Sequence, residues 1–178
     1  YFVDVRARGA RGAETWASTT FAVTSARRVA SLELDAPYSE VGGTLSGKFT
    51  LEGKQLRRES VRVDLVDSRN RIVARSDLDA AGDSVAFKFD VEPWMPMLTR
   101  VVARLLAGGQ EVDHQYATFH VTKRNRGRFN FLIWGYPTGT LAPWAERALA
   151  KYGVTLQLDR KNPPNYVAAN EIAWVPYT

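Results

Sequence analysis

The stretch FNFLIWG at residues 129–135 decides how the fold is interpreted, because the pattern of the sequence changes there. Phe129 and residues 131–134 make the stretch almost continuously apolar, as in strands buried on both faces of a parallel sheet. A loop with two glycines and a proline follows at 135–139, then apolar residues at helical spacing. The segment VTLQL at 154–158 returns as a second strand, so the order predicts a βαβ unit.

The helix of this unit has recognisable ends. Thr140 is a suitable cap, Pro143 is tolerated in the first turn, and Gly153 suits the left-handed position after the last turn. Its large apolar residues form one stripe, which we expect to lie in the core, Trp144 and Tyr152 included. The stripe consists of Leu141, Trp144, Ala148, Leu149 and Tyr152. A short helix near 166–169 and a strand near 172–175 are expected to follow.

Upstream, the pattern is that of short β-strands. Val85, Phe87, Phe89 and Val91 alternate with polar or small residues, and turns rich in Gly, Asn, Asp or Pro separate about seven such segments. Residues 25–122 therefore predict one complete immunoglobulin-like β-sandwich, a fold of about 100 residues.

Residues 1–24 contain two alternating segments around a glycine-bearing turn, which predicts a hairpin. The segment TFAVT at 20–24 matches TFHVT at 118–122, an offset of 118 − 20 = 98 residues. Residues 1–24 are therefore interpreted as the last hairpin of a preceding β-sandwich. Because Tyr1 already lies inside a strand pattern, we expect the chain to be part of a longer protein.

Composition and charge limit the kinds of partner and of site that the chain can have. The net charge is +5, and one basic cluster, Lys123, Arg124, Arg126 and Arg128, falls between the two structured regions. Residues 123–128 are interpreted as a solvated basic linker, so no nucleic-acid partner is expected. No apolar run is long enough to cross a bilayer, so no membrane partner is expected either. Without Cys there is no thiolate metal site and no cysteine nucleophile.

A sandwich, a basic linker and then FNFLIWG with its helix resemble the junction in large multimodular bacterial glycoside hydrolases of the β-galactosidase-like group. The segment VDLVDSRNRIV at 63–73 is similar to a strand–turn–strand of their accessory modules. The resemblance implies a mainly β chain, with the immunoglobulin-like sandwich followed at 129–178 by the start of a truncated α/β domain, a TIM barrel. It also implies an extracellular or periplasmic location and no cofactor. The implied partners are other domains of the same chain and an oligosaccharide or polysaccharide bound by the full-length protein.

In barrels, function lies at the carboxyl ends of the strands. Those positions hold Trp134, Tyr136, Asp159, Arg160 and Tyr177, which we predict to bind substrate. An aromatic face beside polar groups suits a sugar ring, and Trp134 and Tyr136 are the first candidates. For Trp134 the alternative is packing between strand and helix.

Complete catalytic chemistry is not expected from this chain. Glycosidases need two carboxylates about 5–5.5 Å apart, or a wider pair, and neither Glu146 nor Glu171 makes a convincing pair with Asp159. His114 and His120 lack a third metal ligand nearby and are expected at the surface. We therefore predict no catalytic residue and no metal site.

The leading hypothesis is a non-catalytic accessory sandwich joined to the opening of the barrel of a carbohydrate-active glycoside hydrolase. One alternative is a structural or adhesive immunoglobulin-like array with a doubly wound ligand-binding domain. Another is a doubly wound domain of the amidotransferase or flavodoxin kind after the sandwich.

Overall fold

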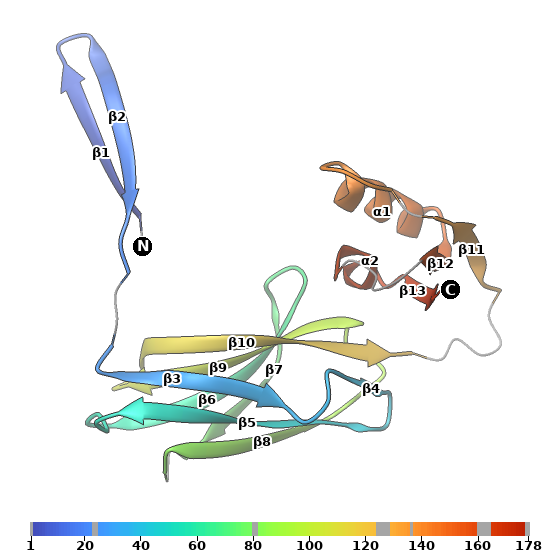
Figure 1. Cartoon of the computed structure of the whole chain (residues 1–178), viewed down its shortest axis with the longest axis horizontal. Helices are drawn as coiled ribbons and strands as arrows, with labels where there is room; N and C mark the ends of the chain where they lie inside the picture. The colour runs from blue at the N-terminus through green and yellow to red at the C-terminus, as the bar shows by residue number, and fades with distance from the viewer. Residues whose placement is uncertain are drawn as a thin grey trace.

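The structure is a computed structural model, and it is mainly β (Figure 1). It describes residues 2–22, 25–79, 82–123, 129–135, 137–159 and 165–176. The expected linker therefore lies outside the described residues, apart from Lys123. Within the described part of the chain, no helix combines the length and the apolar character that a membrane span needs.

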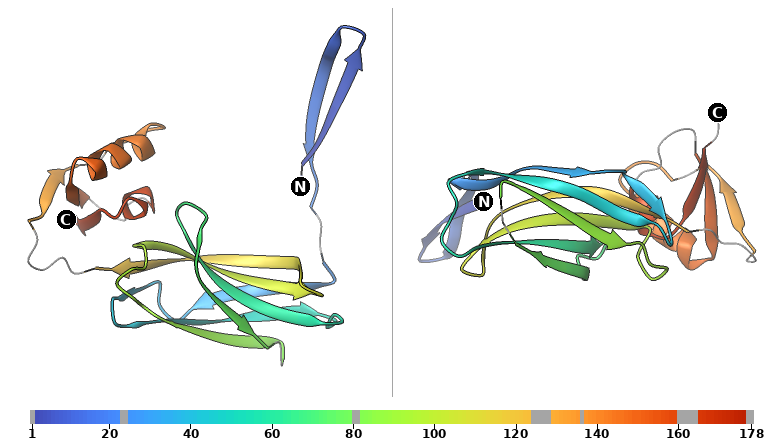
Figure 2. Two further views of the ribbon diagram at one scale, coloured as in Figure 1. Left: turned by 180° about the vertical axis from the view of Figure 1, so that it is seen from behind. Right: turned by 90° about the horizontal axis from the view of Figure 1, so that it is seen from below.

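Residues 27–122 form two facing sheets, which we call the sandwich (Figures 1 and 2). One sheet has the order β4-β10-β9-β6-β7 and the other β3-β5-β8. All neighbours are antiparallel except β4 and β10, which are parallel. The strands of the first sheet are β4 (Tyr38–Glu40), β6 (Glu59–Asp67), β7 (Ile72–Leu78), β9 (Leu98–Ala107) and β10 (Gln110–Thr122). Those of the second are β3 (Arg27–Leu34), β5 (Thr44–Gly53) and β8 (Ser84–Asp90).

The core of the sandwich lies between these sheets, because alternate residues of each strand face inward. Phe49 and Phe87 come from the three-stranded sheet, and Leu65, Leu105 and Phe119 come from the five-stranded sheet. All five are buried in one cluster. The alternation expected around Phe87 is confirmed, since β8 buries Val85 and Phe87 and exposes the residues between them.

One buried ion pair crosses from sheet to sheet. Arg27 on β3 is only 3% exposed, and its guanidinium lies 3.0 Å from the carboxylate of Glu59 at the start of β6. It also donates to the carbonyl of Gly53 at 2.7 Å and to Asp83 at 2.9 Å. The hydrogen bond from Arg27 to Glu59 raises the pKa of the guanidinium, so the charge is held in place.

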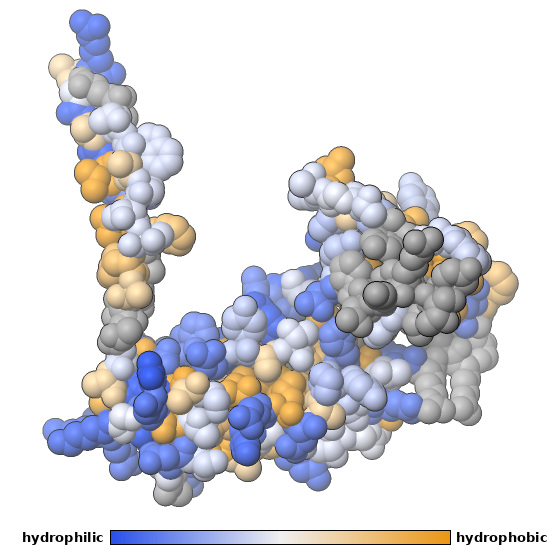
Figure 3. All heavy atoms as spheres, in the orientation of Figure 1, coloured by the Kyte–Doolittle hydropathy of each residue, from blue (hydrophilic) through white to orange (hydrophobic). Residues whose placement is uncertain are grey.

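The amino-terminal hairpin consists of β1 (Phe2–Gly9) and β2 (Gly12–Thr20), paired antiparallel as the sequence predicts. Every side chain that is described in this segment is exposed, including Val5 and Trp16. Apolar residues are visible along its surface in Figure 3. A lone hairpin is marginal in water, so its apolar face needs a partner.

The pairing of this hairpin repeats that of β9 and β10. Adding 98 to Val3↔Thr19 gives Val101↔Ala117, and the same shift carries Arg6↔Trp16 onto a pair of the sandwich, Arg104↔His114. Both hairpins also carry a bulge at the equivalent place. In the first hairpin the register shifts between residues 7 and 8, and in the second it shifts between residues 111 and 113 of the partner strand. The repeat found in the sequence is therefore a repeat of strand register as well.

The carboxy-terminal part forms its own three-stranded sheet with the order β11-β12-β13 (Figures 1 and 2). Both strand pairs are parallel, and a helix lies between each strand and the next along the chain. The elements are β11 (Phe131–Trp134), α1 (Ala142–Lys151), β12 (Val154–Asp159), α2 (Asn165–Ala169) and β13 (Ala173–Pro176). We call these elements the α/β unit. Its small core gathers around Val154, Val167 and Ile172.

Two expectations about α1 are wrong. Trp144 and Tyr152 are 64% and 82% exposed, because the helix buries Ala142 and Glu146 and packs only Leu149 of the expected stripe against the core of the α/β unit. The cap is also different. Leu141 occupies the N-cap position without a side-chain hydrogen bond, so Thr140 does not cap the helix.

The expectation that β11 is buried on both faces is also wrong for this chain. Among the described strands, β11 pairs only with β12 and lies at the edge of the sheet. Phe131 and Leu132 are therefore about half exposed, and only Ile133 packs against the core of the α/β unit.

Candidate functional site

Parallel pairing brings the carboxyl ends of three strands to one edge of the α/β unit. Trp134 is paired with Leu158, and Asp159 is paired with Pro176. The last residues of β11, β12 and β13 therefore lie next to one another, where an open α/β sheet or a barrel binds its ligands.

The predicted substrate-binding residues can be placed only in part. Trp134 is 75% exposed at the end of β11, so it does not pack between strand and helix. The backbone of Asp159 ends β12 beside it. Tyr136, Arg160 and Tyr177 lie outside the described residues. The structure thus brings two of the five positions to one edge, and the binding role of all five remains a prediction.

A buried amide supports this edge from within. Gln157 of β12 donates a hydrogen bond from Nε2 to the carbonyl of Gly135 at 2.9 Å, just after Trp134. The same Nε2 lies 3.1 Å from Oε1 of Glu146 on α1. One side chain therefore connects the central strand, the helix and the loop that follows the exposed tryptophan. Sequence reasoning missed Gln157, although its position in an apolar strand pattern was a signal.

Glu146 is completely buried, and burial raises the pKa of its carboxyl group, partly offset by the hydrogen bond from Gln157. Within the described part of the chain, Glu146 Oε2 and Gln157 Oε1 find no hydrogen-bond partner. The carboxyl group of Glu146 is therefore enclosed between α1 and β12, next to the side chain of Gln157.

Glu171 connects the α/β unit to the sandwich. It has a positive φ of 60°, and its carboxylate accepts a hydrogen bond from the backbone N–H of Met97 at 2.7 Å. The other oxygen lies 2.8 Å from Nζ of Lys123. Both partners belong to the sandwich side, so Glu171 joins the two parts of the chain. A second contact, from Ser68 Oγ to the carbonyl of Ala169 at 3.3 Å, lies close by.

Among the residues that the structure describes, no three His, Cys, Asp or Glu side chains lie close enough together to hold a metal ion. His114 is half exposed and lies 3.0 Å from Glu111, as expected of a surface residue. His120 is half-buried instead, and burial lowers the pKa of its imidazole.

No protein-family model matches the sequence, and no curated protein matches it either. Solved glycoside hydrolases resemble this chain. A β-galactosidase-like protein from Bacteroides fragilis aligns at 14% identity with a TM-score of 0.45, over 83% of this chain and 29% of its own. The apo β-glucuronidase from Ruminococcus gnavus aligns at 12% identity with a TM-score of 0.43, over 84% and 30%.

A superoxide reductase from Ignicoccus hospitalis also aligns, at 7% identity with a TM-score of 0.38, over 51% of this chain and 79% of its own. The present chain spans less than a third of the length of the two glycoside hydrolases.

Proposed function

We propose that the chain is a non-catalytic accessory sandwich joined to the opening of the barrel of a multidomain, carbohydrate-active glycoside hydrolase. The observation that carries this proposal is the carboxyl edge of the parallel sheet, where Trp134 is 75% exposed at the end of β11. An exposed indole face at such an edge suits the C–H surface of a sugar ring. Tyr136, Asp159, Arg160 and Tyr177 follow the same strand ends in sequence and complete the proposed substrate platform.

The order of the parallel strands supports a barrel. In β11-β12-β13 each strand lies next to its successor, as around a (β/α)₈ barrel. A flavodoxin-like sheet has the order 2-1-3, which these strands do not follow, whereas the other doubly wound order, 3-2-1-4-5-6, also places its first three strands side by side. The strand order therefore disfavours only the flavodoxin-like alternative, and we propose that residues 129–178 begin a barrel.

The arrangement of the sandwich supports an immunoglobulin-like module. Two mainly antiparallel sheets enclose one core, with β6, β9 and β10 adjacent in one sheet and β3, β5 and β8 in the other. The shared register of β1–β2 and β9–β10 supports a preceding module of the same kind, to which residues 1–24 contribute the last hairpin.

We infer the absence of catalysis from the burial of Glu146 and from the contacts of Glu171. Glu146 is enclosed, and the carboxylate of Glu171 is occupied by Met97 and Lys123. Neither is free to pair with Asp159 at the strand edge. The catalytic carboxylates would belong to other parts of the full-length protein, which we place outside the cytoplasm, in the periplasm or the extracellular space.

Two measurements test this function. The isolated chain is expected to leave a panel of nitrophenyl glycosides intact, whereas the full-length protein hydrolyses at least one of them. Hydrolysis by the isolated chain would refute the non-catalytic assignment. In the full-length protein, Trp134→Ala should weaken oligosaccharide binding, while Trp94→Ala, which changes an exposed tryptophan on the sandwich, should not.

The adhesive alternative is favoured by one observation, the repeated hairpin register, because a chain of modules would also produce it. The same assay separates the two functions. A full-length protein that binds saccharides or surfaces but hydrolyses no glycoside would favour the adhesive array.

A further inference from the structure

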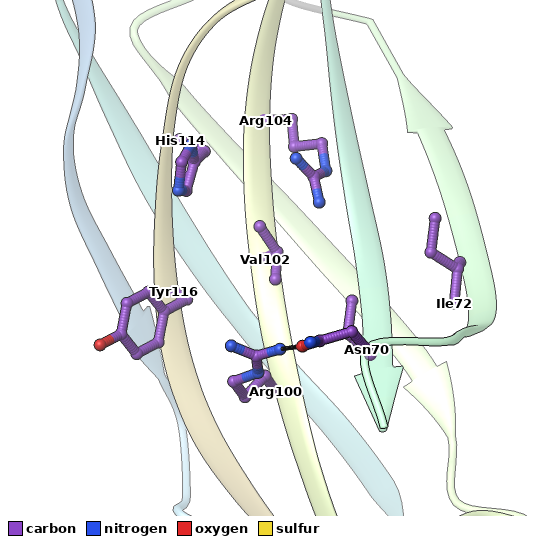
Figure 4. Close-up of a pocket in the computed structure, with 8 residues that line it drawn as sticks. Asn70, Ile72, Arg100, Val102, Arg104, His114 and Tyr116 are labelled. Carbon is purple, nitrogen blue, oxygen red and sulfur yellow. Dashed lines mark hydrogen bonds between the residues drawn. The ribbon is translucent and has the colours of Figure 1, made fainter. Parts of the chain in front are cut away.

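A hollow of about 290 Å³ lies on the face of the five-stranded sheet that is turned away from the core (Figure 4). Val66 of β6 and Val102 of β9 are nearly buried and line it without belonging to the core cluster. Polar and aromatic side chains from β9, β10 and the β6–β7 turn surround them. An apolar floor with a few convergent polar groups is the usual composition of a small-ligand site, and this volume is at the small end of such sites.

Arg104, which lines the hollow, has its charge balanced within the protein. Its Nε donates to Asp64 at 2.8 Å, and its Nη1 is bound to Glu111. Asp64 is fully buried and also accepts a hydrogen bond from Arg75 Nε at 2.8 Å. The hydrogen bond that Arg75 donates to Asp64 raises the pKa of the Arg75 guanidinium.

Arg100 differs from Arg104 in one respect. Its guanidinium is hydrogen-bonded to the amide oxygen of Asn70, a neutral group. Within the described residues Arg100 has no carboxylate partner. One cation at the rim of the hollow is therefore not neutralised, which suits a ligand with a single negative charge. A guanidinium binds a carboxylate through two parallel N–H groups more readily than any other side chain does.

The turn that carries Asn70, the partner of Arg100, is held by hydrogen bonds. Asn70 has a left-handed φ of 62° in a turn that the carboxylate of Asp67 holds, accepting hydrogen bonds from the N–H groups of Arg69 at 2.8 Å and Arg71 at 2.9 Å. Burial alone would raise the pKa of Asp67, but these hydrogen bonds lower it overall, so the turn keeps its anion at neutral pH. The side chain of Asn70, which projects from this turn, accepts a hydrogen bond from the guanidinium of Arg100.

Tyr116 and Ile72 contribute exposed apolar surface at the rim of the same hollow. We propose that the hollow binds one carboxylate-bearing sugar ring, of the uronic acid class. Arg100 binds the carboxylate, Tyr116 covers a C–H face of the ring, and Asn70 and His114 offer polar groups to its hydroxyls. The choice of a sugar among ring carboxylates rests on the function proposed above, whereas the anion site itself does not.

The equivalent positions of the first hairpin indicate that the hairpin fold itself does not require Arg100 or Tyr116. At the positions 98 residues upstream, in the same register, Phe2 stands in place of Arg100 and Ser18 in place of Tyr116. Two of the residues that line the hollow therefore have no chemical equivalent in the first hairpin.

The test is a titration of the ¹⁵N-labelled chain, followed by NMR, with D-glucuronate, D-glucose and cyclohexanecarboxylate. Glucuronate should shift the amide signals of β9, β10 and the β6–β7 turn and bind more tightly than either other compound. Arg100→Ala should weaken glucuronate binding roughly tenfold to a hundredfold, the effect of losing a charged hydrogen bond. Arg28→Ala is the matched control, because Arg28 is an exposed arginine on the other sheet.

Four results would overturn the proposal. Absence of glucuronate binding, or binding that Arg100→Ala leaves unchanged, would remove the site. Equal binding of cyclohexanecarboxylate would retain an anion site but refute the sugar assignment. Equal binding of glucose would refute the role of the carboxylate. None of these results bears on whether the full-length protein hydrolyses glycosides, so the two proposals can fail separately.

Discussion

The carboxylate of Glu171 accepts a hydrogen bond from the backbone N–H of Met97 across 74 residues of sequence. Met97 immediately precedes β9, and Glu171 lies between α2 and β13. This one contact therefore connects the first strand of the closing hairpin of the sandwich with the α/β unit. Lys123, the first residue after the sandwich, supports this contact with its charge.

Removing the carboxylate of Glu171 should loosen this joint. Glu171→Ala leaves the Met97 N–H without its acceptor, at a cost of about 1–3 kcal/mol in the docking of the two parts. Hydrogen exchange of the Met97 amide should accelerate, while exchange in the centre of β9 should not.

Lys123→Ala is the matched control for the ionic part. The Lys123–Glu171 pair is partly exposed, so its loss should cost less than about 1 kcal/mol and leave Met97 protected. Equal protection of Met97 in the wild type and in Glu171→Ala would contradict the joint.

Arg27 and its neighbour Arg28 provide a second comparison. Arg27→Ala leaves the buried carboxylate of Glu59 without its cation and should destabilise the sandwich by about 3–5 kcal/mol. Arg28→Ala removes an exposed pair with Glu52 and should cost less than about 1 kcal/mol. Urea unfolding of both variants measures the difference, and equal losses would refute the role of the buried pair.

The buried carboxyl group of Glu146 should make the α/β unit sensitive to pH. Its pKa is raised in the folded state, so the folded state binds more protons than the unfolded state between about 4.3 and that raised value. The stability of the unit should therefore be greatest below this window and fall as the pH rises through it.

Glu146→Gln should remove this dependence. At neutral pH it should stabilise the unit by about 1–3 kcal/mol, because it abolishes a buried charge and supplies an N–H donor beside the unpartnered Gln157 Oε1. Urea titrations followed by the NMR signals of α1 and β12 measure this, with the exposed Glu33→Gln as a control of equal charge change. A wild-type unit whose stability did not fall with rising pH would contradict the account.

The shared register of the two hairpins predicts that one can replace the other. A chimera with residues 1–24 in place of 99–122 should fold, since Val3 and Phe21 would occupy the core positions of Val101 and Phe119. It should be less stable by about 2–5 kcal/mol, because Ala7 replaces the buried Leu105.

A graft shifted by one residue is the control for the chimera. Residues 2–25 in place of 99–122 would turn the apolar set to the solvent face, so this graft should not fold. Cooperative unfolding of both grafts, or of neither, would contradict the register match.

Local patterns predicted much of this architecture. Alternation at Val85 and Phe87 gave a strand of the sandwich, and the apolar run ending at Trp134 gave the first strand of a parallel unit. Gly153 has the left-handed φ that its place after α1 suggested. Such features depend on a few neighbouring residues, so a single sequence is sufficient to find them.

Long-range packing could not be predicted in the same way. Trp144 is more apolar than Glu146, yet α1 exposes Trp144 and buries Glu146, whose carboxyl group is hydrogen-bonded to Gln157 of the facing strand. The hydrogen bond that Glu171 accepts likewise depends on Met97, which lies close to Glu171 only in the tertiary fold. The hollow around Arg100 depends on three strands meeting in one register.

The central claim is that the chain changes from antiparallel sheets to a parallel α/β unit after residue 123. Cross-strand NOEs in the labelled chain test it most directly. We predict contacts of Leu132 with Leu156 and of Leu158 with Val175, as parallel pairing requires. Contacts of Leu132 with the edge strands of the sandwich, or an antiparallel pattern between β11 and β12, would contradict the account.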